Sequence, residues 1–145
     1  MVDLTRQAEL RDAIERLYFA YRAFTDRPDR ILERRGLGRV HHRILYFVGR
    51  HPGIPIKGLL EVLGVSKQAL NAPLRQLIEM TLVAATANAA DRRIRNLQLT
   101  EQGRRLEAEL TGAQTRHLEA ALSRAGPDAE TGWRTVMAAL AASPD

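Results

Sequence analysis

Residues 55–71 read Pro-Ile-Lys-Gly-Leu-Leu-Glu-Val-Leu-Gly-Val-Ser-Lys-Gln-Ala-Leu-Asn, a pattern typical of two short helices joined by a tight turn. The first helix is predicted over residues 55–63, where three apolar side chains recur at helical spacing: Leu59, Val62 and Leu63. Gly64 suits the left-handed conformation that ends a helix, and Ser66 is a favourable N-cap for a second helix over residues 66–80. This arrangement predicts a helix-turn-helix, whose second helix can enter the major groove of DNA.

The predicted second helix has one apolar face and one polar face. Leu70, Leu74 and Leu77 recur at intervals of four and three residues, so we expect them to face the core. The polar side chains on the other faces are the candidate DNA-binding residues of this helix: Ser66, Lys67, Gln68, Asn71 and Arg75. The same pattern also fits an ordinary helix with a solvated face, but the segment that follows favours DNA binding.

A short hairpin rich in arginine is predicted after the two helices. Residues 82–87 and 94–99 are compatible with strands, and residues 88–93 between them are polar and turn-like. Three cations gather at the tip and on the returning strand: Arg92, Arg93 and Arg95. Packing does not require these charges, whose mutual repulsion would be relieved by phosphates or by a narrow minor groove. We therefore predict that the hairpin is the wing of a winged helix-turn-helix.

The charge of the chain is concentrated in the same region. The total net charge is +5, but residues 34–105 hold 13 Lys and Arg against four Asp and Glu, a net of +9. The flanking segments together carry a net charge of −4. Arginine outnumbers lysine by 20 to two, which favours bidentate contacts with phosphate or guanine. This distribution predicts double-stranded DNA as the partner of the central region.

The composition argues against several other classes of protein. A length of 145 residues suggests one compact unit, and the absence of cysteine excludes a disulfide scaffold and a thiolate zinc site. There is no secretory signal and no apolar run of the roughly 20 residues of a membrane span, so we expect a cytoplasmic protein without a membrane partner. The sequence has no nucleophile motif, no glycine-rich phosphate loop and no paired carboxylates in an apolar setting. We therefore predict neither an enzyme nor a cofactor.

The remaining sequence predicts four more helices. They are expected over about residues 3–25, 38–50, 101–125 and 128–142. The segment Asp26-Arg-Pro-Asp29 is expected to end the first of them, and Thr100 to cap the third. The predicted fold class is therefore mainly α, with a small β-hairpin as the wing.

The first helix and the last two carry more apolar surface than a small winged helix needs to cover itself. They either extend one core or join two chains. A reader of palindromic DNA needs two heads at a fixed spacing, which favours a homodimer. We expect residues 1–36 and 104–145 to form a dimerisation region, and residues 37–103 to form the DNA-binding domain.

In their order and spacing, these segments resemble the MarR family of bacterial transcriptional regulators over about residues 37–110. The segments that carry the resemblance are Leu45 to Gly53, Leu59 to Ser66, Leu77, Leu82-Val83, Asp91-Arg92-Arg93 and Leu99-Thr100-x-x-Gly103. The resemblance implies an obligate homodimer that represses transcription until a small, often aromatic or phenolic, anion binds. It also implies that Arg93 enters the minor groove, that Asp91 holds the wing tip in shape, and that residues 66–75 belong to the recognition helix.

Four positions depart from the family pattern. Gly38 stands where Thr or Ser often caps the second helix, Ala72 replaces a frequent Arg, and Thr81 replaces a frequent Gly before the wing. Pro73 lies inside the recognition helix, where it removes one backbone hydrogen bond and predicts a kink. These departures do not change the predicted fold. They leave the DNA sequence that the protein binds, and the angle at which the recognition helix docks on it, unpredicted.

A ligand pocket is predicted between the DNA-binding domain and the dimerisation helices. Its candidate lining residues could also be simply core: Tyr18, Tyr21, Phe24, His42 and Tyr46. A zinc-sensing branch of the family uses histidines of the second and fifth helices, where His42 and His117 lie in this chain. Single histidines near an interface are more often structural, so we predict no metal site. The alternative function is a winged-helix module for protein interaction or DNA architecture, without ligand control.

Overall fold

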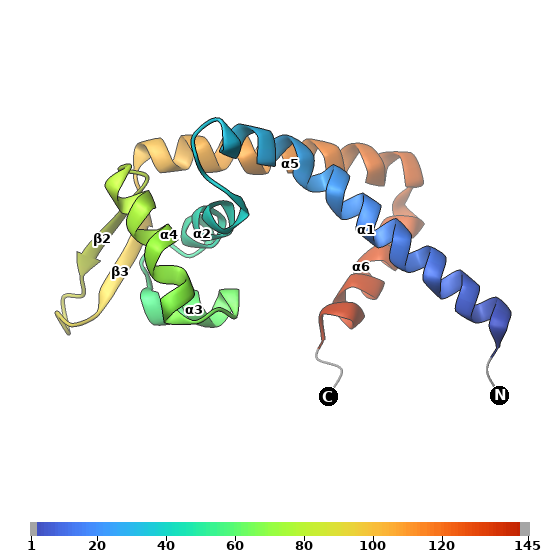
Figure 1. Cartoon of the computed structure of the whole chain (residues 1–145), viewed down its shortest axis with the longest axis horizontal. Helices are drawn as coiled ribbons and strands as arrows, with labels where there is room; N and C mark the ends of the chain where they lie inside the picture. Colours follow the sequence, from blue (N-terminus) through green and yellow to red (C-terminus); the bar gives the residue numbers. More distant parts are fainter. Residues whose placement is uncertain (1–2, 143–145) are drawn as a thin grey trace.

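The computed structural model describes residues 3–142. Six helices and three short strands follow one another along these residues (Figure 1): α1 (Leu4–Glu33), α2 (Arg39–Arg50), β1 (Ile54–Pro55), α3 (Ile56–Leu63), α4 (Lys67–Glu79), β2 (Val83–Ala87), β3 (Arg95–Leu99), α5 (Glu101–Ala125) and α6 (Pro127–Ala141). The helices α2, α3 and α4 lie with the sheet below one end of α5, whereas α1 and α6 project from its other half. The chain is thus a mainly α winged helix-turn-helix protein, as predicted.

The turn between α3 and α4 forms through the residues that the sequence indicated. Gly64 follows α3 with a left-handed φ of 65°, which glycine adopts without steric cost. Ser66 caps α4, because its Oγ accepts a hydrogen bond of 3.1 Å from the backbone N–H of Ala69. The left-handed Gly64 ends α3 and the Ser66 cap starts α4, so the chain turns between the two helices within three residues.

The apolar faces of α3 and α4 are confirmed at all positions but one. The three predicted leucines of α4 are buried: Leu70, Leu74 and Leu77. On α3, Leu59 is buried, and Ile56 and Leu63 pack against the core beside it. The prediction that Val62 faces the core is wrong, because the contact face of α3 passes beside it and leaves it 46% exposed.

The wing belongs to a three-stranded antiparallel sheet with the order β1-β3-β2. Strands β2 and β3 form the predicted hairpin, in which Val83 pairs with Leu99. Strand β1 was not predicted, because its two residues are too few to show an alternating pattern. Its Ile54 pairs with the fully buried Leu97, so the sheet joins the root of the wing to the core.

One hydrophobic core joins α2, the helix-turn-helix, the sheet, the end of α1 and the first half of α5. Its fully buried side chains are Leu32, Ile44, Leu45, Val48, Leu59, Leu70, Leu77, Leu82, Val83, Leu97, Leu106 and Leu110. Helix α5 contributes to this core and then continues beyond it toward α6. It therefore links the winged part of the molecule directly to the projecting helices.

Helix α1 corrects the prediction of a break at residues 26–29. It runs without interruption from Leu4 to Glu33, with Pro28 inside it. Pro28 and Leu32 are both buried, so packing offsets the backbone hydrogen bond that a proline cannot donate, a cost of about 3 kcal/mol. The segment that was predicted to be a turn instead carries α1 into the core.

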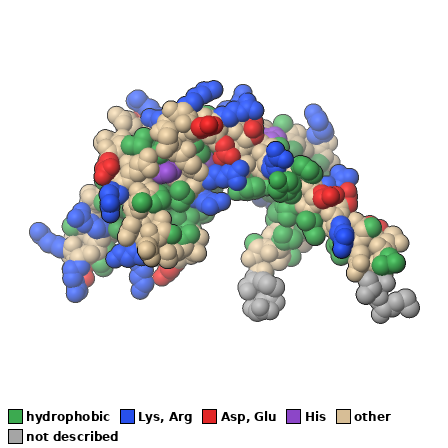
Figure 2. Space-filling model, in the orientation of Figure 1, with side chains coloured by type: hydrophobic (Ala, Val, Ile, Leu, Met, Phe, Trp, Pro, Cys, Tyr) green, Lys and Arg blue, Asp and Glu red, His purple; other side chains and the backbone are tan. Residues whose placement is uncertain are grey.

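The outer parts of α1 and α6 carry large apolar side chains that the other described residues cover only in part, with exposed fractions of 39% to 76%. They include Leu4, Leu10, Ile14, Leu17, Phe19, Trp133, Val136 and Leu140. Both helices extend away from α5 as two legs, across a hollow from the winged part (Figure 2). Contiguous apolar surface of this kind marks an interaction face. No helix within the described part of the chain is long and apolar enough to span a membrane.

Candidate nucleic-acid interface and the adjoining pocket

The polar residues predicted on the second helix of the helix-turn-helix lie on the exposed side of α4. The exposed set is Ser66, Lys67, Gln68, Asn71 and Arg75. Helix α4 continues through Pro73. The carbonyl of Ala69, which loses its donor to this proline, belongs to an exposed residue that water can reach. An exposed row of donors and acceptors near the start of this helix is what contact with base edges requires.

The tip of the wing is held by one carboxylate. Oδ1 of Asp91 accepts hydrogen bonds of 3.0 Å from the backbone N–H and from Nε of Arg93, and Oδ2 accepts one of 3.0 Å from Nη2. The hydrogen bonds from Arg93 lower the pKa of the Asp91 carboxyl, which favours its ionised form. The side chain of Arg93 is nevertheless 91% exposed. Arg92 and Arg95 are exposed beside it, and basic side chains gather around this end of the molecule (Figure 2).

The motif Leu99-Thr100-x-x-Gly103 lies at the root of the wing, where Thr100 and Gly103 make the contacts that require these two residue types. Oγ1 of Thr100 accepts the N–H of Gly103 at 3.0 Å and donates to the carbonyl of Thr81 at 2.6 Å. Gly103 is required there, because a Cβ would lie 1.9 Å from the carbonyl oxygen of Leu82. Thr81, where the family often has Gly, itself adopts a left-handed φ of 62°. These contacts seat the start of α5 against the turn before β2 and thereby position the wing.

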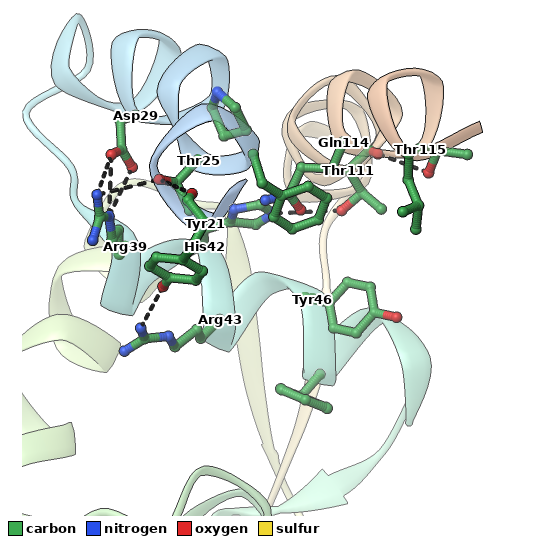
Figure 3. Close-up of a pocket in the computed structure, with 14 residues that line it drawn as sticks. Tyr21, Thr25, Asp29, Arg39, His42, Arg43, Tyr46, Thr111, Gln114 and Thr115 are labelled. Atoms are coloured by element: carbon green, nitrogen blue, oxygen red, sulfur yellow. Dashed lines mark hydrogen bonds and ion pairs between the residues drawn. The ribbon is translucent and has the colours of Figure 1, made fainter. Parts of the chain in front are cut away.

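A cavity of about 390 Å³ lies between α1, α2 and α5 (Figure 3). Four of the five predicted pocket residues line it: Tyr21, Phe24, His42 and Tyr46. The prediction for Tyr18 is wrong: this residue does not line the cavity, is 57% exposed, and packs its ring against that of Phe19 at a centroid distance of 5.2 Å. The cavity also holds polar residues that the sequence did not reveal: Thr25, Asp29, Arg39, Arg43, Thr111, Gln114 and Thr115.

The two arginines of the pocket are held differently. Nη2 of Arg39 lies 2.9 Å from Oδ2 of Asp29 and donates to Oγ1 of Thr25 at 3.3 Å (Figure 3). Arg43 donates from Nη2 to the hydroxyl of Tyr21 at 3.3 Å and makes no ion pair with any of residues 3–142. Arg43 is therefore the cation of this pocket whose charge remains available to an anionic ligand.

The pocket histidine is kept neutral by its surroundings. Burial lowers the pKa of His42, and this effect exceeds the opposite influence of the carboxylates of Glu107 and Asp29. Its Nε2 lies 3.4 Å from Oγ1 of Thr111, on the opposite wall. A neutral imidazole at this place offers one donor and one acceptor to a ligand.

The two histidines considered for a metal site lie in different cavities. His117 stacks on Phe24 at a centroid distance of 6.5 Å and lines a second cavity, of about 420 Å³, that does not contain His42. Within residues 3–142, no cluster of three or more His, Cys, Asp or Glu could hold a metal ion. The observed polar contacts of His42 are with a threonine instead.

The helix-turn-helix packs its apolar face against the core and leaves the polar face of α4 exposed beside a basic wing. These features define a DNA-binding protein of the winged helix-turn-helix class. A sequence model of the MarR family matches residues 35–94. The HTH-type transcriptional regulator PetP of Rhodobacter capsulatus is 48% identical over 132 residues, which cover 91% of this chain and 80% of that protein. The chain belongs to the MarR family of transcriptional regulators, which confirms the resemblance noted in the sequence.

Solved structures share the fold at lower sequence identity. The MarR family transcription regulator SP03579 superposes with a TM-score of 0.77 at 21% identity, over 94% of this chain and 90% of that one. NadR, solved in complex with 4-hydroxyphenylacetate, superposes with a TM-score of 0.71 at 20% identity, over 86% of this chain and 88% of that one. These alignments cover most of each chain, so the two proteins share the overall fold of this chain.

Proposed function

We propose that this regulator is a homodimeric repressor that binds a pseudo-palindromic operator and releases it when a small aromatic anion enters the pocket. The observation that carries the DNA-reading role is the exposed guanidinium of Arg93, aimed by Asp91 beside the polar front of α4. In this proposal Asp91 supports the wing, and eight residues contact DNA: Ser66, Lys67, Gln68, Asn71 and Arg75 in the major groove, and Arg92, Arg93 and Arg95 at the wing.

A second copy of the chain is the proposed partner of the two apolar legs. The exposed side chains of α1 and α6 include Ile14, Leu17 and Trp133, and both legs point away from the core of their own chain. Removal of such side chains from water between two copies contributes about 25 cal/mol for each Å² of apolar surface, which opposes the entropy lost on association. In this proposal residues 1–36 and 104–145 form the dimerisation region, and residues 37–103 form the DNA-binding domain.

We expect sedimentation equilibrium at micromolar concentration to show a dimer with no folded monomer. Substitution of Ile14 by Asp should weaken the association, because it places a charge in the apolar contact. Substitution of the exposed Ala108 by Asp, on a helix face without large apolar side chains, serves as the control. A stable species of 16.2 kDa for the unmodified chain would contradict the dimer.

A small aromatic anion is the proposed effector because of what the pocket offers. Tyr21 and Tyr46 provide aromatic walls, and Arg43 provides a cation without a carboxylate partner among the described residues. The pocket borders α2, which packs against both α4 and α5, so a ligand there contacts the connection between the two parts of the chain. NadR, which shares the fold, was solved with 4-hydroxyphenylacetate, and this supports the same chemical class here.

We expect 4-hydroxyphenylacetate at millimolar concentration to weaken DNA binding by the unmodified chain, because its carboxylate can pair with Arg43. The Arg43→Ala variant should lose most of this response, measured as the ratio of DNA dissociation constants with and without the compound. The Arg27→Ala variant, altered outside this pocket, should keep it. Ligand control is contradicted if the compound binds, as shown by a thermal shift, and the DNA affinity of the unmodified chain stays the same.

A further inference from the structure

A chain of three hydrogen bonds ties α4 to the turn that joins α1 to α2. Nδ1 of His41 accepts the backbone N–H of Gly38 at 2.9 Å, and Nε2 of His41 lies 2.9 Å from Oε1 of Gln76 on α4. Nε2 of Gln76 in turn donates to the carbonyl of Gly36 at 3.3 Å. His41 is 8% exposed, so water competes little for these bonds.

The direction of each hydrogen bond follows from the backbone. The N–H of Gly38 can only donate, so Nδ1 of His41 carries no proton and Nε2 carries one. Gln76 must then turn its oxygen to His41, which leaves its amide protons for the carbonyl of Gly36. All three hydrogen bonds can form only with this orientation of the Gln76 amide, which favours a single position of the Gln76 side chain.

His41 has a double role that explains the unusual N-cap of α2. Gly38 has no side chain with which to cap the helix, and His41 stands three residues later, where Glu or Gln usually accepts the N–H of the N-cap residue. The imidazole performs that function with Nδ1 and reaches α4 with Nε2. One imidazole therefore serves both helices at once, whereas a Glu carboxylate could accept the N–H of Gly38 but has no proton to donate to Oε1 of Gln76.

The hydrogen bonds of His41 and Gln76 connect the turn between α1 and α2 to α4, the helix proposed to read DNA. Gly36 belongs to the turn that ends α1, where the N–H of Leu37 bonds to the carbonyl of Leu32 at 2.9 Å. Gln76 follows Asn71 by five residues on α4, beyond the polar front proposed to meet DNA. We propose that His41, acting through Gln76, is a positioning residue for DNA reading: it sets the angle of α4 against the α1–α2 turn. This inference rests on the proposed role of α4.

Two substitutions break the link from opposite ends. His41→Asn keeps an acceptor for the N–H of Gly38, because Oδ1 of asparagine takes the position of Nδ1, and it has no atom at the position of Nε2 that contacts α4. Gln76→Ala loses the same contact without touching the cap of α2. Each should lower the affinity for the duplex that the unmodified chain selects from a random-sequence pool by roughly two- to tenfold, the worth of about one net hydrogen bond. The double variant should be no weaker than the weaker single variant, because both remove one interaction. The salt dependence should not change, since no phosphate contact is lost.

His51→Asn is the matched control, because His51 is exposed and its side chain makes no hydrogen bond with residues 3–142. The affinity of this variant should equal that of the unmodified chain. Direct contact of Gln76 with DNA would instead make Gln76→Ala harmful and His41→Asn harmless, which overturns the proposal. A merely structural role would lower the unfolding temperature of His41→Asn and leave the affinity of the folded protein unchanged, and this result would overturn the proposal as well.

Nitrogen-15 NMR of the histidine rings tests the link without DNA. The unmodified chain should show His41 in the form with the proton on Nε2, and Gln76→Ala should shift both ring nitrogens of His41 while those of His51 stay in place. An unchanged His41 spectrum in Gln76→Ala would show that the link does not exist in solution. If the unmodified chain selects no duplex at all, the proposed function fails, and the NMR comparison still decides whether the link forms.

Discussion

Replacement of Gly103 by alanine is expected to lower the free energy of unfolding by about 3 kcal/mol or more. The new Cβ would lie 1.9 Å from the carbonyl oxygen of Leu82 and 2.9 Å from its carbonyl carbon. Neither group can rotate away, because that oxygen accepts the N–H of Thr100 and the N–H of Leu82 bonds to the carbonyl of Leu77. Denaturant unfolding followed by circular dichroism measures the loss.

Gly112→Ala, on the same helix, is the matched control for Gly103→Ala. The only atom near the added Cβ there is Nη1 of Arg116, at 3.3 Å, the end of a flexible side chain that can move. We expect this variant to stay within about 1 kcal/mol of the unmodified chain, since alanine favours a helix over glycine. Equal stability of the two variants would contradict the described contact between α5 and the root of the wing.

Replacement of Arg93 by alanine is expected to weaken DNA binding by about 1–3 kcal/mol, and to reduce any preference for a narrow minor groove at the outer base pairs. The side chain of Arg93 is 91% exposed, and Asp91 already orients its guanidinium, so little conformational entropy remains to be lost when this group meets DNA. Fluorescence anisotropy with a selected duplex at fixed salt concentration measures the effect. The fold should be unaffected, because an exposed ion pair contributes little to stability.

Two further variants separate the wing contact from a general loss of charge. Arg124→Ala removes the same charge at the end of α5, and its affinity should change much less. Asp91→Asn keeps one acceptor and loses the ionised carboxylate, so its affinity should fall between those of Arg93→Ala and the unmodified chain. If Arg93→Ala and Arg124→Ala bind DNA equally well, the wing does not enter the groove.

Most of the fold could be predicted because its signals are local. Gly64 ends α3, and Ser66 and Thr100 cap the helices that follow them, through contacts with residues within four positions in each case. The prediction of a helix break at Pro28 was wrong for a different reason. The lost backbone hydrogen bond is a local cost, but burial of Pro28 against the core outweighs it, and the sequence of α1 alone does not show that burial. Val62 was misplaced because the direction of a helix face depends on what packs against it.

In the candidate site too, contacts between residues near each other in the sequence could be predicted, and contacts between distant residues could not. The wing pair was predictable, because Asp91 and Arg93 are two residues apart and their motif is specific. The polar side of the pocket was not, because Arg39 meets Asp29 only after α1 and α2 have packed together. The link between His41 and Gln76 spans 35 positions and leaves no pattern in either helix. Local motifs therefore pointed to the proposed DNA contacts, while the pocket and the positioning of α4 required the structure.

Selection of duplexes from a random-sequence pool, followed by footprinting of the enriched site, tests the central claim most directly. The claim is that two copies of the chain read DNA together through α4 and the wing. We expect one enriched sequence with a dyad, half-site centres roughly 10–11 base pairs apart, and protection of both half-sites at the same protein concentration. An enriched site without a dyad, protection of one half-site alone, or no enrichment above the starting pool would contradict the claim.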